Sequence, residues 1–275
     1  MIIFRLRFPP SLKKLRRMET LFQRRRKPQP LFPYFRAMKL DILAFAAHPD
    51  DIELTCSGTL LRQKALGNTI GIVDLTRGQL GTRGTAETRK EEAAAAAKLL
   101  GLDIRENLGM EDGFFVNDQA HQLKIIEAIR AYRPEIILCN AIRDRHIDHG
   151  KGGALVSDSC FLSGLLKIET FRDGQKQEPW RPKAVYHYIQ DRYIEPDFVL
   201  DVTEFYEKKK EVILAYKTQF FQGGDNQPET PISSKDFFEF LEARAREFGR
   251  RINTTYAEGF TVERTAGVKD LFDLV

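Results

Sequence analysis

Short apolar runs alternate with segments of helical pattern along most of this chain, from Met38 onward. Leu40–Ala47, Thr69–Thr76 and Glu135–Ala141 are rich in large aliphatic residues, as expected of strands buried on both faces. Further strands are predicted at Asp103–Leu108, Ala184–Ile189 and Asp197–Val202, and helices at Glu53–Leu66, Glu87–Leu100, His121–Tyr132, about 204–218 and about 234–249. This alternation predicts an α/β fold, a doubly wound and mainly parallel sheet with helices on both faces.

The composition is that of a globular protein without a membrane-spanning segment. Of the 275 residues, 42% are hydrophobic and 30% are charged, which is ordinary for globular proteins. No apolar run approaches the roughly 18 residues of a membrane span. Three scattered cysteines (Cys56, Cys139 and Cys160) are too few for a disulfide framework or a zinc ribbon, and we expect them in the core of a cytoplasmic protein.

The first 37 residues differ in charge from the rest. They hold eleven basic side chains and one acid, which gives +10 and leaves −6 for the remaining residues. We therefore divide the chain into a basic extension, 1–37, disordered or non-native, and a single catalytic domain, 38–275. A leader from an upstream start codon, a basic arm for nucleic acid or acidic lipid, and a targeting peptide all remain open for the extension. A secretory signal is disfavoured, because no apolar stretch follows the basic part.

Acidic and histidine side chains follow two of the predicted strands, where each strand ends. In such sheets, ligands sit outside the carboxyl ends of the strands. The residues concerned are His48, Asp50 and Asp51 after the first strand, and His146, Asp148 and His149 after the strand that ends at Ala141. The fold therefore predicts that these two stretches, about a hundred residues apart in the sequence, lie side by side.

These residue types suit a metal-dependent hydrolase. His48, Asp51 and His149 can supply three ligands to Zn²⁺ and leave a position open for water, whose pKa a bound zinc ion lowers to about 7. Asp50 suits a general base. His146 suits an acid or an oxyanion donor, oriented by Asp148.

Other interpretations of the same residues stay open. An Asp-Asp pair after a strand can be a helix cap, a single histidine is often only hydrogen-bonded, and Fe²⁺ or another divalent metal accepts the same ligands. In the loop Thr76–Thr85 and just beyond it, Arg77, Arg83 and Arg89 could bind an anion or simply be solvated. The loop is neither a dinucleotide fingerprint nor a Walker A motif, and the chain has no nucleophile elbow.

The two histidine motifs resemble a known family. His48-Pro49-Asp50-Asp51 followed by His146-Ile147-Asp148-His149 is similar to the zinc-dependent N-acetylglucosamine deacetylases of the PIG-L/LmbE family, from Met38 to the C-terminus. Ile147 stands where many relatives have proline. The run from Thr76 to Glu87, with Tyr186-His187-Tyr188 and Tyr256-Ala257-Glu258-Gly259-Phe260, is similar to the bacillithiol-biosynthesis branch, which deacetylates N-acetylglucosaminyl-malate.

The resemblance implies a Rossmann-like fold, a homo-oligomer (hexamer or trimer) and roles for individual residues. The family's metal ligands fall on His48, Asp51 and His149, its base on Asp50, and its oxyanion histidine on His146 with Asp148. Its supporting arginine falls on Arg181 and a substrate contact on Arg89, to which we add Arg77 and Arg83 as partners for the malate carboxylates.

The implied substrate is a small, anionic conjugate of N-acetylglucosamine, with neither nucleic acid nor membrane as a partner. Two alternatives remain. One is a deacetylase of another N-acetylglucosamine conjugate, such as a mycothiol-type, chitobiose or antibiotic precursor. The other, from a different class, is a protein that binds anionic polymers through its basic tail.

Overall fold

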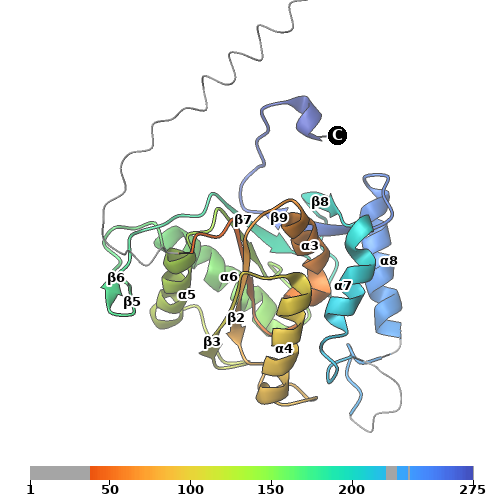
Figure 1. Cartoon of the computed structure of the whole chain (residues 1–275), viewed down its shortest axis with the longest axis horizontal. Coiled ribbons are helices and arrows are strands. Elements are labelled where there is room, and N and C mark those ends of the chain that lie inside the picture. Colours follow the sequence, from red (N-terminus) through yellow and green to blue (C-terminus); the bar gives the residue numbers. More distant parts are fainter. Residues whose placement is uncertain (1–37, 221–227, 235, 275) are drawn as a thin grey trace, which may run out of the picture. The chain divides into compact units, whose positions relative to one another are not determined.

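The computed structural model describes residues 38–220, 228–234 and 236–274. The predictions for residues 1–37 lie outside this range. The described residues form one central sheet covered by helices (Figure 1), as the alternating sequence pattern predicts.

The central sheet has seven strands in the order β3-β2-β1-β4-β7-β9-β8. Their bounds are β1 (Ile42–Ala46), β2 (Ile70–Thr76), β3 (Ile104–Met110), β4 (Ile136–Cys139), β7 (Ala184–Tyr188), β8 (Phe198–Asp201) and β9 (Ala257–Val262). The first five in that order are parallel, whereas β9 is antiparallel to both β7 and β8. Two short strands, β5 (Phe171–Arg172) and β6 (Gln175–Lys176), pair separately.

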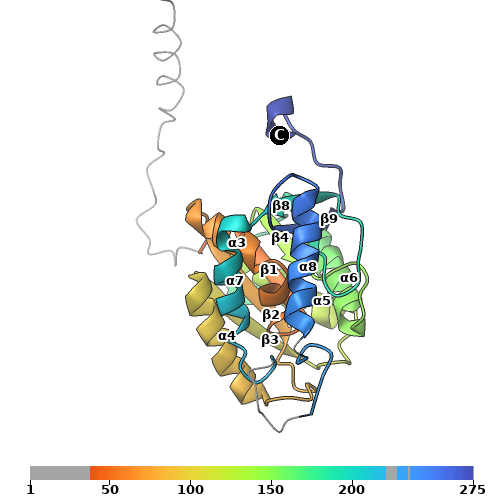
Figure 2. The same cartoon turned by 90° about the vertical axis from the view of Figure 1, so that its right-hand side faces the viewer.

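Helices cover both faces of the sheet. Their bounds are α2 (Asp51–Thr55), α3 (Ser57–Ala65), α4 (Ala86–Leu100), α5 (Gln119–Tyr132), α6 (Ile147–Leu162), α7 (Tyr206–Ile213) and α8 (Asp236–Arg250), with 3-10 turns η1 (Thr203–Phe205) and η2 (Leu271–Leu274). Figure 1 shows α5 and α6 on one side of the sheet and α3, α4, α7 and α8 on the other; Figure 2 turns the latter group toward the viewer.

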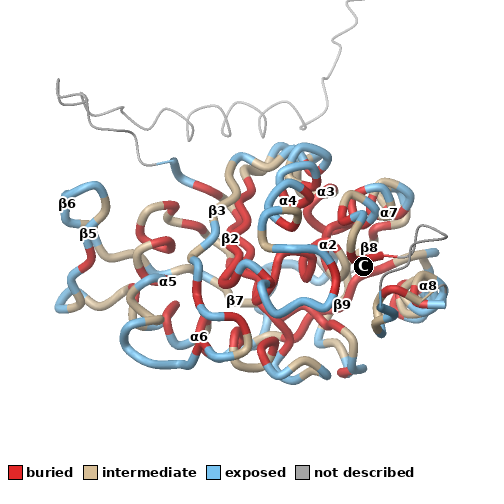
Figure 3. Tube along the Cα trace, turned by 90° about the horizontal axis from the view of Figure 1, so that it is seen from below, coloured by how far each residue is buried: buried red, intermediate tan, exposed pale blue. Residues whose placement is uncertain are grey.

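The fully buried β1 strand contributes to both cores. Ile42, Ala44 and Ala46 pack in one apolar cluster with residues of α3, α4 and α7, while Leu43 and Phe45 pack in a second with residues of α5 and α6. Successive side chains of a strand point to opposite faces, so a sheet covered on both sides needs an apolar residue at every position. Figure 3 shows this buried sheet between helices whose outer sides are exposed.

The segment predicted as one helix over Glu53–Leu66 is two helices, broken at Cys56. The Ser57 hydroxyl donates to the carbonyl of Glu53, 2.6 Å away, a contact that competes with helical hydrogen bonding. The carboxylate of Glu258 on β9 then accepts the backbone N–H groups of Gly58 (3.0 Å) and Thr59 (2.6 Å). It therefore caps the N-terminus of α3, where a negative charge is favourable.

Other predictions can also be compared with the structure. The strand β9 was not predicted, although part of it was noted as a motif. The helix expected at 204–218 is η1 followed by a shorter α7. Cys56, Cys139 and Cys160 are free and buried, as expected. Across the ranges given above, no helix has the length and apolar character that crossing a membrane requires.

Candidate active site

The two histidine motifs meet at the point in the sheet where the strand order reverses. Strands β1 and β4 are neighbours, and the chain proceeds from β1 to β2 on one side and from β4 to β7 on the other. A crevice at the carboxyl ends of two such strands is where doubly wound folds bind ligands. His48 follows β1, and His146 and His149 lie at the start of α6, after β4.

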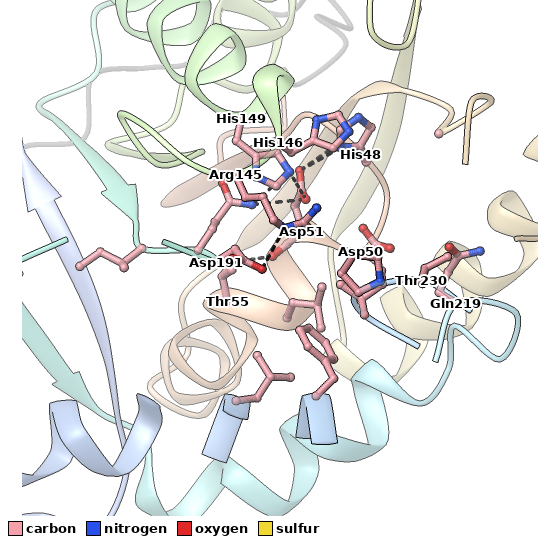
Figure 4. A pocket seen from close by; sticks show the side chains of 18 of the residues that line it. His48, Asp50, Asp51, Thr55, Arg145, His146, His149, Asp191, Gln219 and Thr230 are labelled. Carbon is pink, nitrogen blue, oxygen red and sulfur yellow. Dashed lines mark hydrogen bonds and ion pairs between the residues drawn. The ribbon is translucent and has the colours of Figure 1, made fainter. Parts of the chain in front are cut away.

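Asp51, the first residue of α2, lies between the rings of His48 and His149 (Figure 4). Its Oδ1 is 3.0 Å from Nε2 of His149, and its Oδ2 is 3.7 Å from Nδ1 of His48. The Asn140 amide donates to Oδ2 of the same carboxylate over 2.9 Å, and thereby fixes its orientation. The structure therefore brings together the three residues predicted as metal ligands.

A second carboxylate holds the outer nitrogen of each of these histidines. Asp112 Oδ1 is 3.0 Å from His48 Nε2, and Asp144 Oδ2 is 2.5 Å from His149 Nδ1. Metal-binding histidines commonly have such a partner, which fixes the tautomer and turns the other nitrogen toward the metal. Sequence reasoning missed both residues, although Asp112 could have been found because it follows β3, another strand of the same sheet.

The donor set fits a divalent cation. Two groups among the described residues have ligand atoms within 4.8 Å of one another, namely His48 with His146 and His149, and His48 with Asp112 and Asp148. Imidazole nitrogens and carboxylate oxygens are the donors that Zn²⁺ and Fe²⁺ accept. Neither group includes Asp51, whose carboxylate instead faces the His48 and His149 rings. These histidines and carboxylates together are the residues that could hold such a metal.

Asp50 is turned away from its neighbour Asp51 by an unusual backbone conformation. Its φ is 120°, a value that L residues rarely adopt and that tends to occur at functional sites. Its carboxylate is 3.0 Å from Nη1 of Arg89. Burial raises the pKa of Asp50 to about 7 despite the opposing charge of Arg89. Although burial also acts on Asp51, the charge of His149 and hydrogen bonds to both histidines hold its pKa well below the usual range. Adjacent carboxyl groups with pKa values pushed apart are typical of acid–base sites.

His146 completes the group, and Asp148 lies behind it. The His146 ring centroid is 4.6 Å from that of His48 and 5.1 Å from that of His149. Burial, followed by the charges of those two rings, lowers the pKa of His146. The contact between His146 and Asp148 is made by the backbone N–H of Asp148, which donates to His146 Nδ1 over 3.2 Å.

The carboxylate of Asp148 serves a different neighbour from the one predicted. It accepts the Gly113 N–H over 2.7 Å, pairs with Lys151 Nζ at 2.6 Å and lies 3.5 Å from His48 Nε2. Among the contacts of the described residues, Asp148 therefore supports the His48 ring, and Lys151 is the cation that supports Asp148.

The structure separates the four predicted arginines. Arg89 is buried in the cavity wall, where it donates to the Pro49 carbonyl and to Asp50. Arg77 is exposed and outside the cavity lining, and the Nε of buried Arg83 donates to the Thr218 carbonyl instead.

The support role expected of Arg181 is not the arrangement in the structure. Its guanidinium donates to the carbonyl of Phe161. Arg181 precedes β7, so it lies at the amino end of a strand that is parallel to β1 and β4, whereas the site is at the carboxyl ends.

The candidate metal-binding group, His48, Asp51 and His149, opens into a cavity of about 530 Å³. One part of its wall is made by the motif residues, and the opposite part by apolar side chains of α8, among them Phe237, Phe240 and Leu241. A concave site with a few convergent polar groups and an otherwise apolar lining is typical of small-molecule binding.

Comparisons with known proteins agree with this fold. The family model of PIG-L, described as GlcNAc-PI de-N-acetylase, matches residues 43–160. The crystal structure of the conserved protein TT1542 from Thermus thermophilus superposes with a TM-score of 0.73 at 35% identity, covering 84% of this chain and 98% of that one.

Two curated relatives match over part of the chain. An uncharacterized deacetylase of Escherichia coli K12, YaiS, is 35% identical over 120 residues, 39% of this chain and 61% of YaiS. A 4-oxalmesaconate hydratase of Pseudomonas putida is 24% identical over 182 residues, 61% of this chain and 69% of the hydratase. Neither name points to bacillithiol biosynthesis, so the closer resemblance to that branch stays a prediction.

Proposed function

Because the chain belongs to the PIG-L family, we propose that it is a metal-dependent hydrolase that removes the N-acetyl group from a conjugate of N-acetylglucosamine. One observation carries this proposal. A buried carboxylate, Asp51, faces two histidines whose outer nitrogens are held by further carboxylates, and a second carboxylate of different pKa, Asp50, stands beside it. This set supports the proposal of a metal site with a separate base beside it.

The proposed roles follow from where each side chain lies. A zinc ion, Fe²⁺ or another divalent metal held by His48, Asp51 and His149 would polarise the acetyl carbonyl and lower the pKa of a water molecule. Asp50 would take a proton from that water as the carbon–oxygen bond forms. His146 would donate a hydrogen bond to the oxyanion. Asp50 would then return the proton to the nitrogen as the carbon–nitrogen bond breaks, which yields acetate and a free amine.

The narrower proposal for the substrate is N-acetylglucosaminyl-malate of bacillithiol biosynthesis. It rests on the motifs between Thr76 and Glu87 and around Tyr186 and Tyr256. Of the four arginines expected to bind or support the substrate, only Arg89 lines the cavity, so the malate carboxylates lack the partners that the sequence offered. Other N-acetylglucosamine conjugates therefore remain candidates.

The test is an acetate-release assay on a panel of such conjugates, with metal content measured in the same preparation. We expect about one equivalent of divalent metal per chain, together with equal amounts of acetate and amine. In His149→Ala we expect both to fall together. Full activity of metal-free protein would refute the proposal. Hydration of an unsaturated acid without acetate release would instead indicate the reaction named for the hydratase relative.

We also propose that residues 38–275 form the catalytic domain, working in the cytoplasm as a homo-oligomer without residues 1–37. A protein that starts at Met38 should keep its activity and its number of chains per oligomer, as measured by sedimentation. If the basic extension binds anionic polymers, salt-sensitive binding should disappear in this shortened protein while hydrolysis continues.

A further inference from the structure

The mouth of the cavity carries several large apolar side chains. Four large apolar side chains line the cavity and are also well exposed: Leu80 (63%), Phe114 (66%), Ile147 (68%) and Phe240 (41%). They come from the segments after β2, β3 and β4 and from α8, so four separate parts of the chain bring them to one place. Exposed apolar groups that gather in this way mark a binding surface.

The apolar lining continues inward from Phe240. Phe237 and Leu241 line the same cavity from α8, and the ring centroids of Phe237 and Phe240 are 6.2 Å apart. The mouth and the metal-binding group therefore belong to one continuous cavity, and a molecule held at the metal by its acetyl group would extend its other end over this surface.

The cations of the cavity wall, in contrast, are already paired with other groups of the chain. Arg89 pairs with Asp50 (3.0 Å), Arg145 with Asp191 (3.2 Å) and Lys209 with Glu258 (2.6 Å), and Arg244 donates to the main-chain carbonyl of Asp191. Within the described residues, each cation that lines the cavity thus has a partner. A carboxylate bound at Arg89, Arg145 or Lys209 would therefore share that cation's charge with the carboxylate that already faces it.

We propose that the cavity accepts N-acetylglucosaminides that carry an uncharged, apolar aglycone, and that Leu80, Phe114, Ile147 and Phe240 hold that aglycone. This inference rests on the proposed function, since the acetyl group must lie at the metal for the aglycone to reach the mouth. It adds a substrate class to the anionic conjugate expected from the sequence. The energy comes from apolar area removed from water.

The experiment compares phenyl and methyl N-acetylglucosaminide, of the same anomeric configuration, as substrates of the metal-loaded full-length protein. Half-burying a phenyl ring should raise kcat/KM about tenfold over the methyl compound. Phe240→Ala and Ile147→Ser should each reduce this ratio, whereas Phe171→Ala should not, because Phe171 is similarly exposed but lies outside the cavity lining. Thermal unfolding of each variant verifies that it is folded.

Two results would overturn the inference: a phenyl-to-methyl ratio within about twofold of one, or an equal loss of the ratio in the Phe240 and Phe171 variants. Its failure is distinct from that of the proposed function, because hydrolysis of the methyl compound alone supports the function and rejects the apolar subsite.

If neither compound loses acetate, the ratio of their calorimetric dissociation constants decides the same question. A ratio near one would reject the subsite, and tighter phenyl binding that Phe240→Ala abolishes would support it.

Discussion

Two loops at neighbouring strand ends use their polar residues in opposite ways. The turn after β1 is short, and within a few residues it places His48, Asp50 and Asp51 in the cavity. The loop after β2 runs from Arg77 to Thr85, yet neither of its arginines lines the cavity.

The difference lies in what the backbone fixes. In the first turn, a left-handed φ at Asp50 sends two successive carboxylates in different directions. In the second loop, Gly78 and Gly81 come so close to the Arg89 guanidinium that an added Cβ would lie 3.3 Å and 3.1 Å from its nitrogens. The first loop therefore supplies the proposed reacting groups, and the second encloses the arginine that pairs with one of them. We frame four predictions around this division, in order of expected effect.

The largest effect is expected from Asp50→Asn in the first turn. Asparagine tolerates a positive φ, so the protein should fold and bind metal, while the loss of the base should lower kcat about 100- to 10,000-fold. Acetate release and metal content measure the two properties. Asp173→Asn is the matched control, because Asp173 also has a positive φ (51°) but lies in the β5–β6 turn. Retained activity in Asp50→Asn would remove the base from this turn.

A smaller effect is expected from the two carboxylates that hold the outer nitrogens of His48 and His149. Asp112→Asn and Asp144→Asn should each weaken metal binding by about 10- to 100-fold, because His48 and His149 lose the partner that fixes their tautomer. Competition with a chelator measures the dissociation constant. Asp118→Asn is the control, since Asp118 pairs with His121 at 2.7 Å away from the site. An unchanged metal affinity in both site variants would contradict the ligand arrangement.

The glycines of the second loop test whether it encloses Arg89. Gly78 has a φ of +64° and Gly67 a φ of +88°, but a Cβ at Gly67 would meet nothing within 4 Å. Alanine at either position should cost about 1 kcal/mol or more of unfolding free energy through backbone strain. Only Gly78→Ala should also lower kcat, by displacing Arg89 from Asp50. Chemical denaturation and acetate release separate these effects, and equal kcat in the two variants would argue against the enclosure.

The smallest effect is expected from arginines that lie outside the cavity lining. Arg77→Ala and Arg181→Ala should change kcat/KM by less than about twofold, as is usual for surface positions away from a site. Arg89→Ala should lower it far more, because the buried Asp50 carboxylate would lose its counter-charge. A tenfold rise in KM for Arg77→Ala would mean that the second loop reaches the substrate after all, and the contrast between the loops would fail.

The sequence allowed the sheet and the meeting of the two histidine motifs to be predicted for the same reason. Buried parallel strands are continuous apolar runs in the sequence, and residues that follow such strands are expected to meet at one edge of the sheet. No sequence pattern indicates in which direction a long side chain points, so the contacts of Arg83 and Arg181 could not be predicted. The helix break at Cys56 was also beyond reach, because the Glu258 carboxylate that caps α3 is 200 residues from Gly58 in the sequence.

That cap has a consequence for synthesis on the ribosome. The segment from β1 to α3 is made about 200 residues before the carboxylate that satisfies the first N–H groups of α3, which arrives only with β9. Contacts of such long sequence separation form late. The nascent protein therefore cannot cap α3 until β9 has been made, and a chain that stops before β9 would expose an uncapped α3 to chaperones and proteases.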